Sequence, residues 1–185
     1  SLEERTLAYH LYRAAIADCD EAVRRNETYV EAWELRGSTR MLWGNVLMSG
    51  PGDAVAQYRE AVRDLDQAVT LGARRDGVWR ERGIAHLHWG VCLAQQRKNP
   101  WEQFTIALGD FDRAIETNPD APDSHWYRGN CRYNRGLFVD GEGKDASEEF
   151  RAALKDYARM LELNPSMKNQ VANQVKNAQA YLRGK

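Results

Sequence analysis

The sequence predicts an all-α protein, a right-handed solenoid built from antiparallel helix pairs. Two observations support this prediction. Three stretches align without gaps at a constant spacing of 46 residues, and the pair Arg36-Gly37 recurs in them as Arg82-Gly83 and Arg128-Gly129. Within each stretch the apolar residues follow helical spacing and not the alternation of a strand. Repetition at a fixed period is typical of stacked supersecondary units that share one continuous core.

The aligned positions also predict the core. One position holds Tyr58, Phe104 and Phe150; a second holds Leu65, Phe111 and Tyr157; a third holds Ala61, Ala107 and Ala153. Side chains that stay apolar at matching places in three copies are expected to face the inside of each helix pair.

The middle unit shows where its two helices begin and end. Its spacing predicts a first helix over 77–98 and a second over 100–117. Asn99 is the expected N-cap, with Pro100 at the first helical position and Glu102 at N3. The cap position repeats as Asp53, Asn99 and Asp145. No helix breaker lies in 91–98, so the extra length of the repeat is expected to lengthen the helices.

These boundaries divide the chain into five segments that form one solenoid domain. Residues 1–28 form a leading half-repeat helix, and three full repeats follow at 29–74, 75–120 and 121–166. Residues 167–185 are expected to form a C-terminal capping helix. One face of that helix is apolar and would shield the last repeat; it carries Met167, Val171, Val175, Ala178 and Leu182.

Composition argues against several partner classes. The 26 basic and 27 acidic side chains give a net charge of −1, so no overall field would draw the protein to nucleic acid or to anionic lipid. No apolar run approaches the roughly 20 residues that span a bilayer. Cys19, Cys92 and Cys131 are too few and too irregularly spaced for a disulfide framework. We therefore expect a cytoplasmic protein with no nucleic-acid or membrane partner.

The motif residues resemble a known family. The third unit is similar to a tetratricopeptide repeat. The similarity is carried by Trp126-Tyr127-Arg128-Gly129-Asn130, then Ala153-Leu154-Lys155-Asp156-Tyr157, then Asn164-Pro165. The stretch 107–116 with Asn118-Pro119 matches the second helix of that repeat still better. The resemblance extends from about residue 8 to residue 166, although the usual repeat has 34 residues and this one is longer by 12.

Charged residues recur at two matching positions. They are Arg36, Arg82 and Arg128 on the first helices and Asp18, Asp64, Asp110 and Asp156 on the second helices. They could line a polar ligand channel, or they could form an internal ladder of ion pairs with one arginine and one aspartate in each unit. The resemblance favours the structural ladder, because similar repeats carry this arginine and this aspartate together.

Candidate catalytic and metal-binding patterns are weak. Gly141-Glu142-Gly143-Lys144-Asp145 lacks the earlier glycine, the hydroxyl residue and the preceding strand of a phosphate loop. His88 and Cys92 have the spacing of two ligands on one helix face, but a metal site needs more than two. The four histidines suggest no catalytic triad. We expect no enzyme, no cofactor and no metal site.

The resemblance implies a concave groove lined by the first helices, in which extended or helical segments of partners lie. Carried over position by position, the lining is Glu34, Ser38, Met41, Leu42, Arg80, Ile84, Leu87, His88, Trp126, Asn130, Tyr133 and Asn134.

One binding role known in the family is not expected here. Family members that clamp a chaperone's terminal carboxylate use basic and amide residues at set positions. This chain has Glu34, Glu81 and Asp123 at those positions, and their negative charges would repel the carboxylate.

The predicted function is therefore a non-catalytic scaffold or adaptor that binds a protein or peptide. Two alternatives remain open at this point: a homo-oligomerisation module that self-associates, and a regulatory domain of a larger enzyme.

Overall fold

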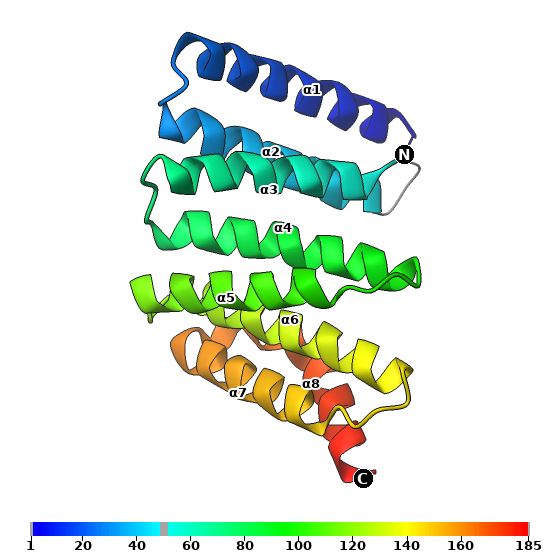
Figure 1. Ribbon diagram of the computed structural model, residues 1–185. Coiled ribbons are helices and arrows are strands. Elements are labelled where there is room, and N and C mark those ends of the chain that lie inside the picture. The colour runs from blue at the N-terminus through cyan, green and yellow to red at the C-terminus, as the bar shows by residue number, and fades with distance from the viewer. Residues whose placement is uncertain (1, 49–51, 185) are drawn as a thin grey trace.

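The computed structural model describes residues 2–48 and 52–184, with side chains from residue 6 onward. All regular elements in this part of the chain are helical. The helices follow one another down a single stack, and the two ends of the chain lie at opposite ends of it (Figure 1). Their bounds are α1 Leu2–Arg25, α2 Val30–Met48, α3 Ala54–Thr70, α4 Asp76–Gln95, α5 Trp101–Thr117, α6 Pro122–Gly141, α7 Ser147–Leu163, the 3-10 turn η1 Pro165–Met167 and α8 Lys168–Arg183.

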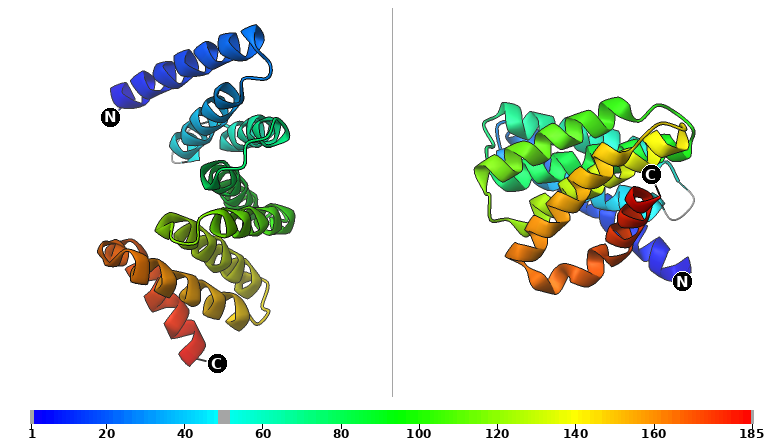
Figure 2. Two further views of the ribbon diagram at one scale, coloured as in Figure 1. Left: turned by 90° about the vertical axis from the view of Figure 1, so that its left-hand side faces the viewer. Right: turned by 90° about the horizontal axis from the view of Figure 1, so that it is seen from below.

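The predicted helical solenoid is confirmed. The closest packing is within the pairs α2–α3, α4–α5 and α6–α7, and each first helix (α2, α4, α6) also contacts the next first helix along the stack. Seen from the side, successive pairs are rotated relative to one another, so the row of helices twists along its length (Figure 2).

The predicted capping residues lie at the start of each second helix. In the second and third units the helix begins one residue later than the position of the capping residue predicts. Asp53 is the N-cap of α3, and its carboxylate accepts a hydrogen bond from the Ala56 N–H at 3.0 Å. In the next unit Asn99 accepts from the Trp101 N–H at 3.0 Å. Helix α5 begins one residue later than predicted, because Pro100 occupies the N-cap position.

The first helix of the middle unit is shorter than predicted. It ends at Gln95 and not at Lys98, because Arg97 adopts a left-handed backbone conformation with φ of 57°. The N–H groups of Arg97 and Lys98 then bond back to the carbonyls of Ala94 and Leu93, which is the Schellman pattern that ends a helix. The missing breaker signal misled the prediction, since the residue at this left-handed position is usually glycine.

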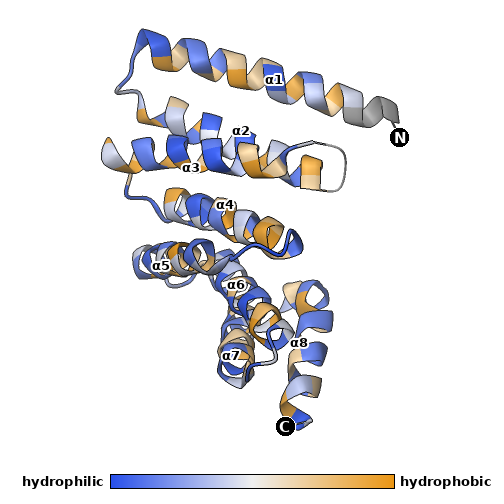
Figure 3. Ribbon diagram, turned by 45° about the vertical axis from the view of Figure 1, so that its right-hand side comes forward, coloured by the Kyte–Doolittle hydropathy of each residue, from blue (hydrophilic) through white to orange (hydrophobic). Residues whose placement is uncertain are grey.

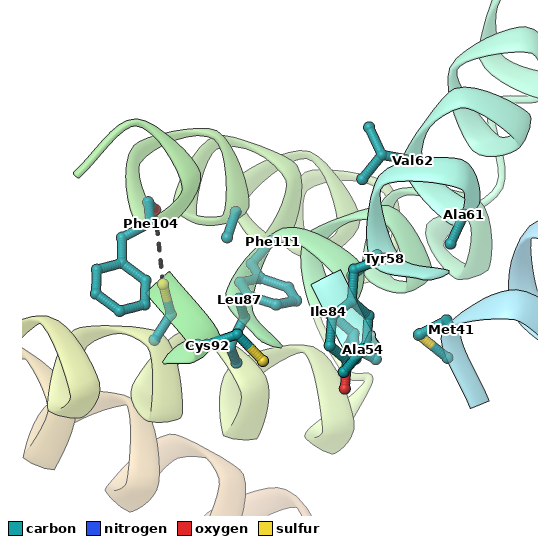
Figure 4. Packing of buried hydrophobic residues seen from close by; sticks show 13 residues of the cluster. Met41, Ala54, Tyr58, Ala61, Val62, Ile84, Leu87, Cys92, Phe104 and Phe111 are labelled. Atoms are coloured by element: carbon teal, nitrogen blue, oxygen red, sulfur yellow. Dashed lines mark hydrogen bonds between the residues drawn. The ribbon is translucent and has the colours of Figure 1, made fainter. Parts of the chain in front are cut away.

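The predicted core positions are buried. Tyr58, Phe104 and Phe111 are at most 1% exposed and lie between the helices of their own pairs (Figure 4). The Arg-Gly motif explains how these rings fit. A Cβ atom built on Gly83 would lie 2.7 Å from Phe111 Cε1, so only a residue without a side chain allows α4 to approach α5 this closely.

The last helix continues the repeat. Helix α8 begins 46 residues after α6, from Pro122 to Lys168; its Val171 and Ala178, with Met167 of the preceding η1, are buried against the third unit. It is a first helix in register. However, Gln174-Val175 stands where earlier units have Arg-Gly.

Candidate functional site

An arginine on each first helix binds two carboxylates from two different second helices. In the middle unit, Arg82 Nη2 and Nε contact the two oxygens of Asp110 at 2.5 and 2.9 Å, within the same helix pair. Its Nη1 contacts Asp66 of the preceding unit at 2.7 Å. The arginine therefore holds its own pair together and joins it to the pair before.

The same arrangement recurs in the other two units. Arg36 contacts Asp64 and Asp20, each at 2.6 Å. Arg128 contacts Asp156 at 2.6 Å and Asp112 at 2.7 Å. The carboxylates at the position of Asp64, Asp110 and Asp156 are buried, at 2% exposure, while those of the preceding unit are more open.

Electrostatics explain why these ions stay paired. Burial alone would lower the pKa of the Arg82 guanidinium, but the hydrogen bonds and charges of Asp110 and Asp66 outweigh it and raise that pKa. Burial raises the pKa of the Asp110 carboxyl, and Arg82 opposes the shift. A carboxylate in this place depends on its arginine, which is the behaviour of a structural pair and not of an open ligand channel.

Part of this ladder was missed in the sequence, and one predicted member does not take part. Asp20, Asp66 and Asp112 also recur at 46 residues, so the inter-unit half of the ladder could have been found. Asp18 of α1, which was predicted to belong to the ladder, is exposed, and Arg36 contacts Asp20 of that helix instead.

Four of the twelve predicted groove residues are buried in the core. Met41, Ile84, Leu87 and Tyr133 are 7%, 6%, 2% and 9% exposed. Ile84 and Leu87 belong to the cluster around Phe104 and Phe111, and Tyr133 belongs to the cluster around Phe150. Neighbouring helices cover these side chains, so the structure does not offer them to a partner.

The remaining eight residues reach the surface at least in part, and we call them the first-helix face. They are Glu34, Ser38, Leu42, Arg80, His88, Trp126, Asn130 and Asn134. Leu42 is the most open of the large apolar side chains among them, at 47% exposure.

Most of the polar members of the first-helix face already bind other residues of the protein. Glu34 pairs with Arg75, and Ser38 donates to Glu81 on the next first helix. Arg80 contacts Asp76 at 3.1 Å. A partner would therefore meet groups whose positions are set by these internal bonds.

His88 and Asn45 form a partly buried bridge between α2 and α4. His88 Nδ1 lies 2.6 Å from Asn45 Oδ1, which also accepts from the Tyr58 hydroxyl at 2.8 Å. Burial lowers the pKa of His88 to about 4, so the imidazole is neutral at pH 7 and its Nδ1–H donates to the amide oxygen.

In the third unit, the side-chain amides of Asn130 and Asn134 form hydrogen bonds within the unit. Asn130 accepts from the Tyr157 hydroxyl at 2.9 Å, and Asn134 donates to the Asn130 carbonyl at 2.8 Å. The Trp126 ring lies 4.6 Å from that of Tyr127 and packs beside the cluster that contains Tyr133.

Part of the chain matches a known protein family. Residues 102–145 match the model of the tetratricopeptide repeat family. This stretch of the chain is a tetratricopeptide repeat. The recurring Arg-Gly and Asp positions of the chain and its stacked helix pairs are those that the motif residues predicted.

The fold is shared with a solved structure, YrrB. YrrB, described as a TPR protein with an unusual peptide-binding site, is similar with a TM-score of 0.55 and 20% identity, over 98% of this chain and 75% of that one. MamA is similar with a TM-score of 0.47 and 15% identity, over 94% and 90% of the two chains. No match was found among curated proteins.

Tetratricopeptide repeats generally serve as protein-interaction scaffolds and are typically non-catalytic. Burial raises the pKa of the Cys19, Cys92 and Cys131 thiols, so none is an activated nucleophile. Within residues 2–48 and 52–184, no three His, Cys, Asp or Glu side chains are grouped to hold a metal ion. None of the described helices is both long and apolar enough to span a bilayer.

Proposed function

We propose that this protein is a non-catalytic adaptor that holds a segment of a partner protein across its first-helix face. The observation that carries the proposal is that three successive first helices each present partly exposed side chains of different character. Leu42 is apolar, Arg80 is cationic and Trp126 is aromatic. Recognition by such a surface is the sum of several contacts from a rigid stack.

The internal bonds of this face support the proposal. Side chains fixed by bonds such as Ser38 to Glu81 lose little rotamer freedom when a partner binds, so the entropic cost of association is lower. Glu34 on this face and the neighbouring Glu81 carry carboxylates, which favours partner segments that are neutral or basic where they cross α2 and α4.

The test begins with peptides selected from a displayed library against the wild-type protein. Their binding is then measured by fluorescence anisotropy with the double variant Leu42→Lys, Arg80→Glu, whose two positions are partly exposed. We expect affinity to fall by at least about tenfold, because an apolar anchor and a charge are both replaced.

The matched control is Arg59→Glu, an exposed position on the second helix α3. It makes the same charge reversal as Arg80→Glu on a different helix row and should leave affinity unchanged. Peptides that bind the double variant as tightly as the wild type would remove the first-helix face from the proposal.

A specific observation also favours self-association as a second candidate. At the α1 edge of the described helices, a groove of about 300 Å³ between α1 and α2 is lined in part by Ala15, Asp18, Tyr29 and Leu35. Leu35 is 60% exposed and Tyr29 is 47% exposed. Figure 3 shows hydrophobic segments along α1 at this end of the stack.

Sedimentation velocity over a wide concentration range separates the two candidates. A homo-oligomer that dissociates in Leu35→Glu would support self-association through this edge. A wild-type protein that stays monomeric throughout would eliminate the second candidate and leave the adaptor role.

A further inference from the structure

A cleft of about 1000 Å³ opens between the second and third units, at the ends of α4 and α6 where they turn back into α5 and α7. In Figure 1 these two connections lie on the right-hand edge of the stack. The cleft is formed by the stretch that makes this repeat longer than 34 residues, and of the first-helix face it includes only Asn134. Its volume is at the upper end of the range typical of ligand sites.

The floor of the cleft is aromatic and aliphatic. Trp101 and Phe138 meet edge to face with ring centroids 6.1 Å apart, and the guanidinium carbon of Arg135 lies 5.5 Å from the centroid of the Trp101 ring. Leu137, also in the lining, is 47% exposed. These side chains offer one large apolar group a surface on which to leave water.

The rim of the cleft is cationic. Arg97, Lys98 and Lys144 line it and are exposed, and the single carboxylate of the lining is Glu142. Lys144 contacts Glu142 at 2.7 Å. Among the charged side chains that line the cleft, two cations thus remain in excess.

Arg97 occupies a place where other helix ends of this protein have glycine. The same Schellman ending closes α3 at Gly72 and α6 at Gly143, both with positive φ, and Gly143 is the repeat equivalent of Arg97. The left-handed region disfavours side chains. A side chain kept in this conformation at the rim of a cleft points to a role for the guanidinium outside the fold itself.

We propose that this cleft is a second peptide-binding site, for an acidic segment that inserts one large apolar side chain. The inserted side chain packs on Trp101 and Leu137, and flanking carboxylates pair with Arg97 and Lys98. The charge of the rim selects acidic partners, while the apolar floor supplies most of the contact. This site goes beyond the first-helix face and does not depend on the adaptor role proposed for that face.

The test uses the ¹⁵N-labelled protein and a blocked peptide of sequence Gly-Asp-Glu-Trp-Glu-Asp-Gly. We expect saturable shifts of the Trp101 indole N–H and of the Arg97 and Leu137 amides, with a Kd below about 1 mM. Replacing the peptide tryptophan by alanine should weaken binding at least about tenfold, because the apolar anchor is lost. Replacing its acids by amides should weaken binding about fivefold at low salt, where charges are least screened.

Two protein variants separate binding from folding. Arg97→Gly removes the charge and suits the left-handed backbone, so we expect an unchanged or higher melting temperature with about fivefold weaker binding. Leu137→Glu places a carboxylate on an exposed position of the floor and should weaken binding at least about tenfold. Arg151→Glu, an exposed charge reversal on α7, is the control and should bind as the wild type does.

Several outcomes would overturn the proposal. They are the absence of saturable shifts, equal affinity for the acidic and amide peptides, or wild-type affinity in Arg97→Gly. Shifts confined to the Leu42 and Arg80 amides would assign the peptide to the first-helix face instead. A concentration-dependent dimer that is lost in Leu137→Glu would show that a second copy of the chain occupies the cleft.

Discussion

The junction of the first two units and the junction of the second and third are built from matching positions, but they close differently. At the first, Ser38 binds Glu81 and Asn45 binds His88, so side chains join α2 to α4. At the second, the equivalent pairs are Ile84 with Tyr127 and Val91 with Asn134.

An isoleucine or a valine cannot hydrogen-bond, so α4 and α6 lack these two links, and the cleft lies beside Val91 and Asn134. The two junctions thus share their core positions and ion pairs and differ in the side-chain bonds between first helices. Four predictions test this contrast.

The largest effect is expected where the junctions are alike. Arg82→Leu leaves Asp110 buried without its partner and also cuts the contact with Asp66 across the first junction; Arg128→Leu does the same with Asp156 and Asp112 at the second. Each should lower the free energy of unfolding by about 3–5 kcal/mol, or the melting temperature by roughly 6–20 °C. Differential scanning calorimetry measures both.

Arg59→Leu, at an exposed site, serves as the control for these variants and should change stability by less than about 0.5 kcal/mol. An unchanged melt for Arg82→Leu would mean that solvent satisfies Asp110, and the ladder would then have no structural role.

The second prediction is a pH dependence that comes from the first junction. The folded pKa of His88 is about 4, below the ordinary 6.5, so the unfolded chain binds the proton more readily. The contribution of neutral His88 to the free energy of unfolding is therefore complete above pH 6.5. It is lost as pH falls from 6.5 towards 4, by at most about 3 kcal/mol. Burial lowers the pKa of His86 as well, which acts in the same direction.

Urea denaturation at pH 7 and pH 5 measures this loss. His88→Asn introduces the residue that occupies the equivalent position, Asn134, at the second junction. The variant should show a weaker pH dependence of the free energy of unfolding and keep only the part due to His86. If the variant loses as much stability between these two pH values as the wild type, the bridge is not responsible.

The third prediction compares how tightly the first and third units are packed. A Cβ on Gly44 would lie 2.6 Å from the Tyr58 ring, which Asn45 holds in place, whereas a Cβ on Gly136 would lie 3.0 Å from Phe150. Gly44→Ala should destabilise by about 1–3 kcal/mol and Gly136→Ala by less. Chemical denaturation of both variants provides the comparison.

Gly109, in the middle of α5, is the control for packing, since a Cβ there would meet nothing within 4 Å. Gly109→Ala should stabilise by about 0.5–1 kcal/mol through helix propensity alone. Equal losses at Gly44 and Gly136 would contradict the difference in packing.

The smallest effect is expected from one bridging bond. Ser38→Ala removes the hydroxyl that donates to Glu81 and should cost about 0.5–1.5 kcal/mol. A double-mutant cycle with Glu81→Gln isolates the pair, and Thr105→Ala on the exposed side of α5 is the control. A coupling energy near zero would show that the bond does not hold the first junction closed.

Much of the architecture could be read in the sequence because its causes are local and repeated. Helical spacing of apolar residues placed Phe104 and Phe111 in the core, and the recurrence of Arg82 with Asp110 predicted their pairing before any coordinates. The end of α4 could not be predicted in this way, since Arg97 takes a backbone conformation that its side chain disfavours and that the surrounding hydrogen bonds impose.

The sequence by itself determined the period, the capping residues and the ion pairs within each unit, because each depends on spacing within one unit or on an exact recurrence between units. Only the tertiary structure decided that Leu87 and Tyr133 are covered, that His88 bridges two helices, and that a cleft lies beside Leu137. The physical reason is that exposure depends on the size and bonding of side chains from the neighbouring unit, more than 40 residues away, as with Asn45 and His88. A periodic pattern shows which side of a helix a residue occupies, but not what packs against it.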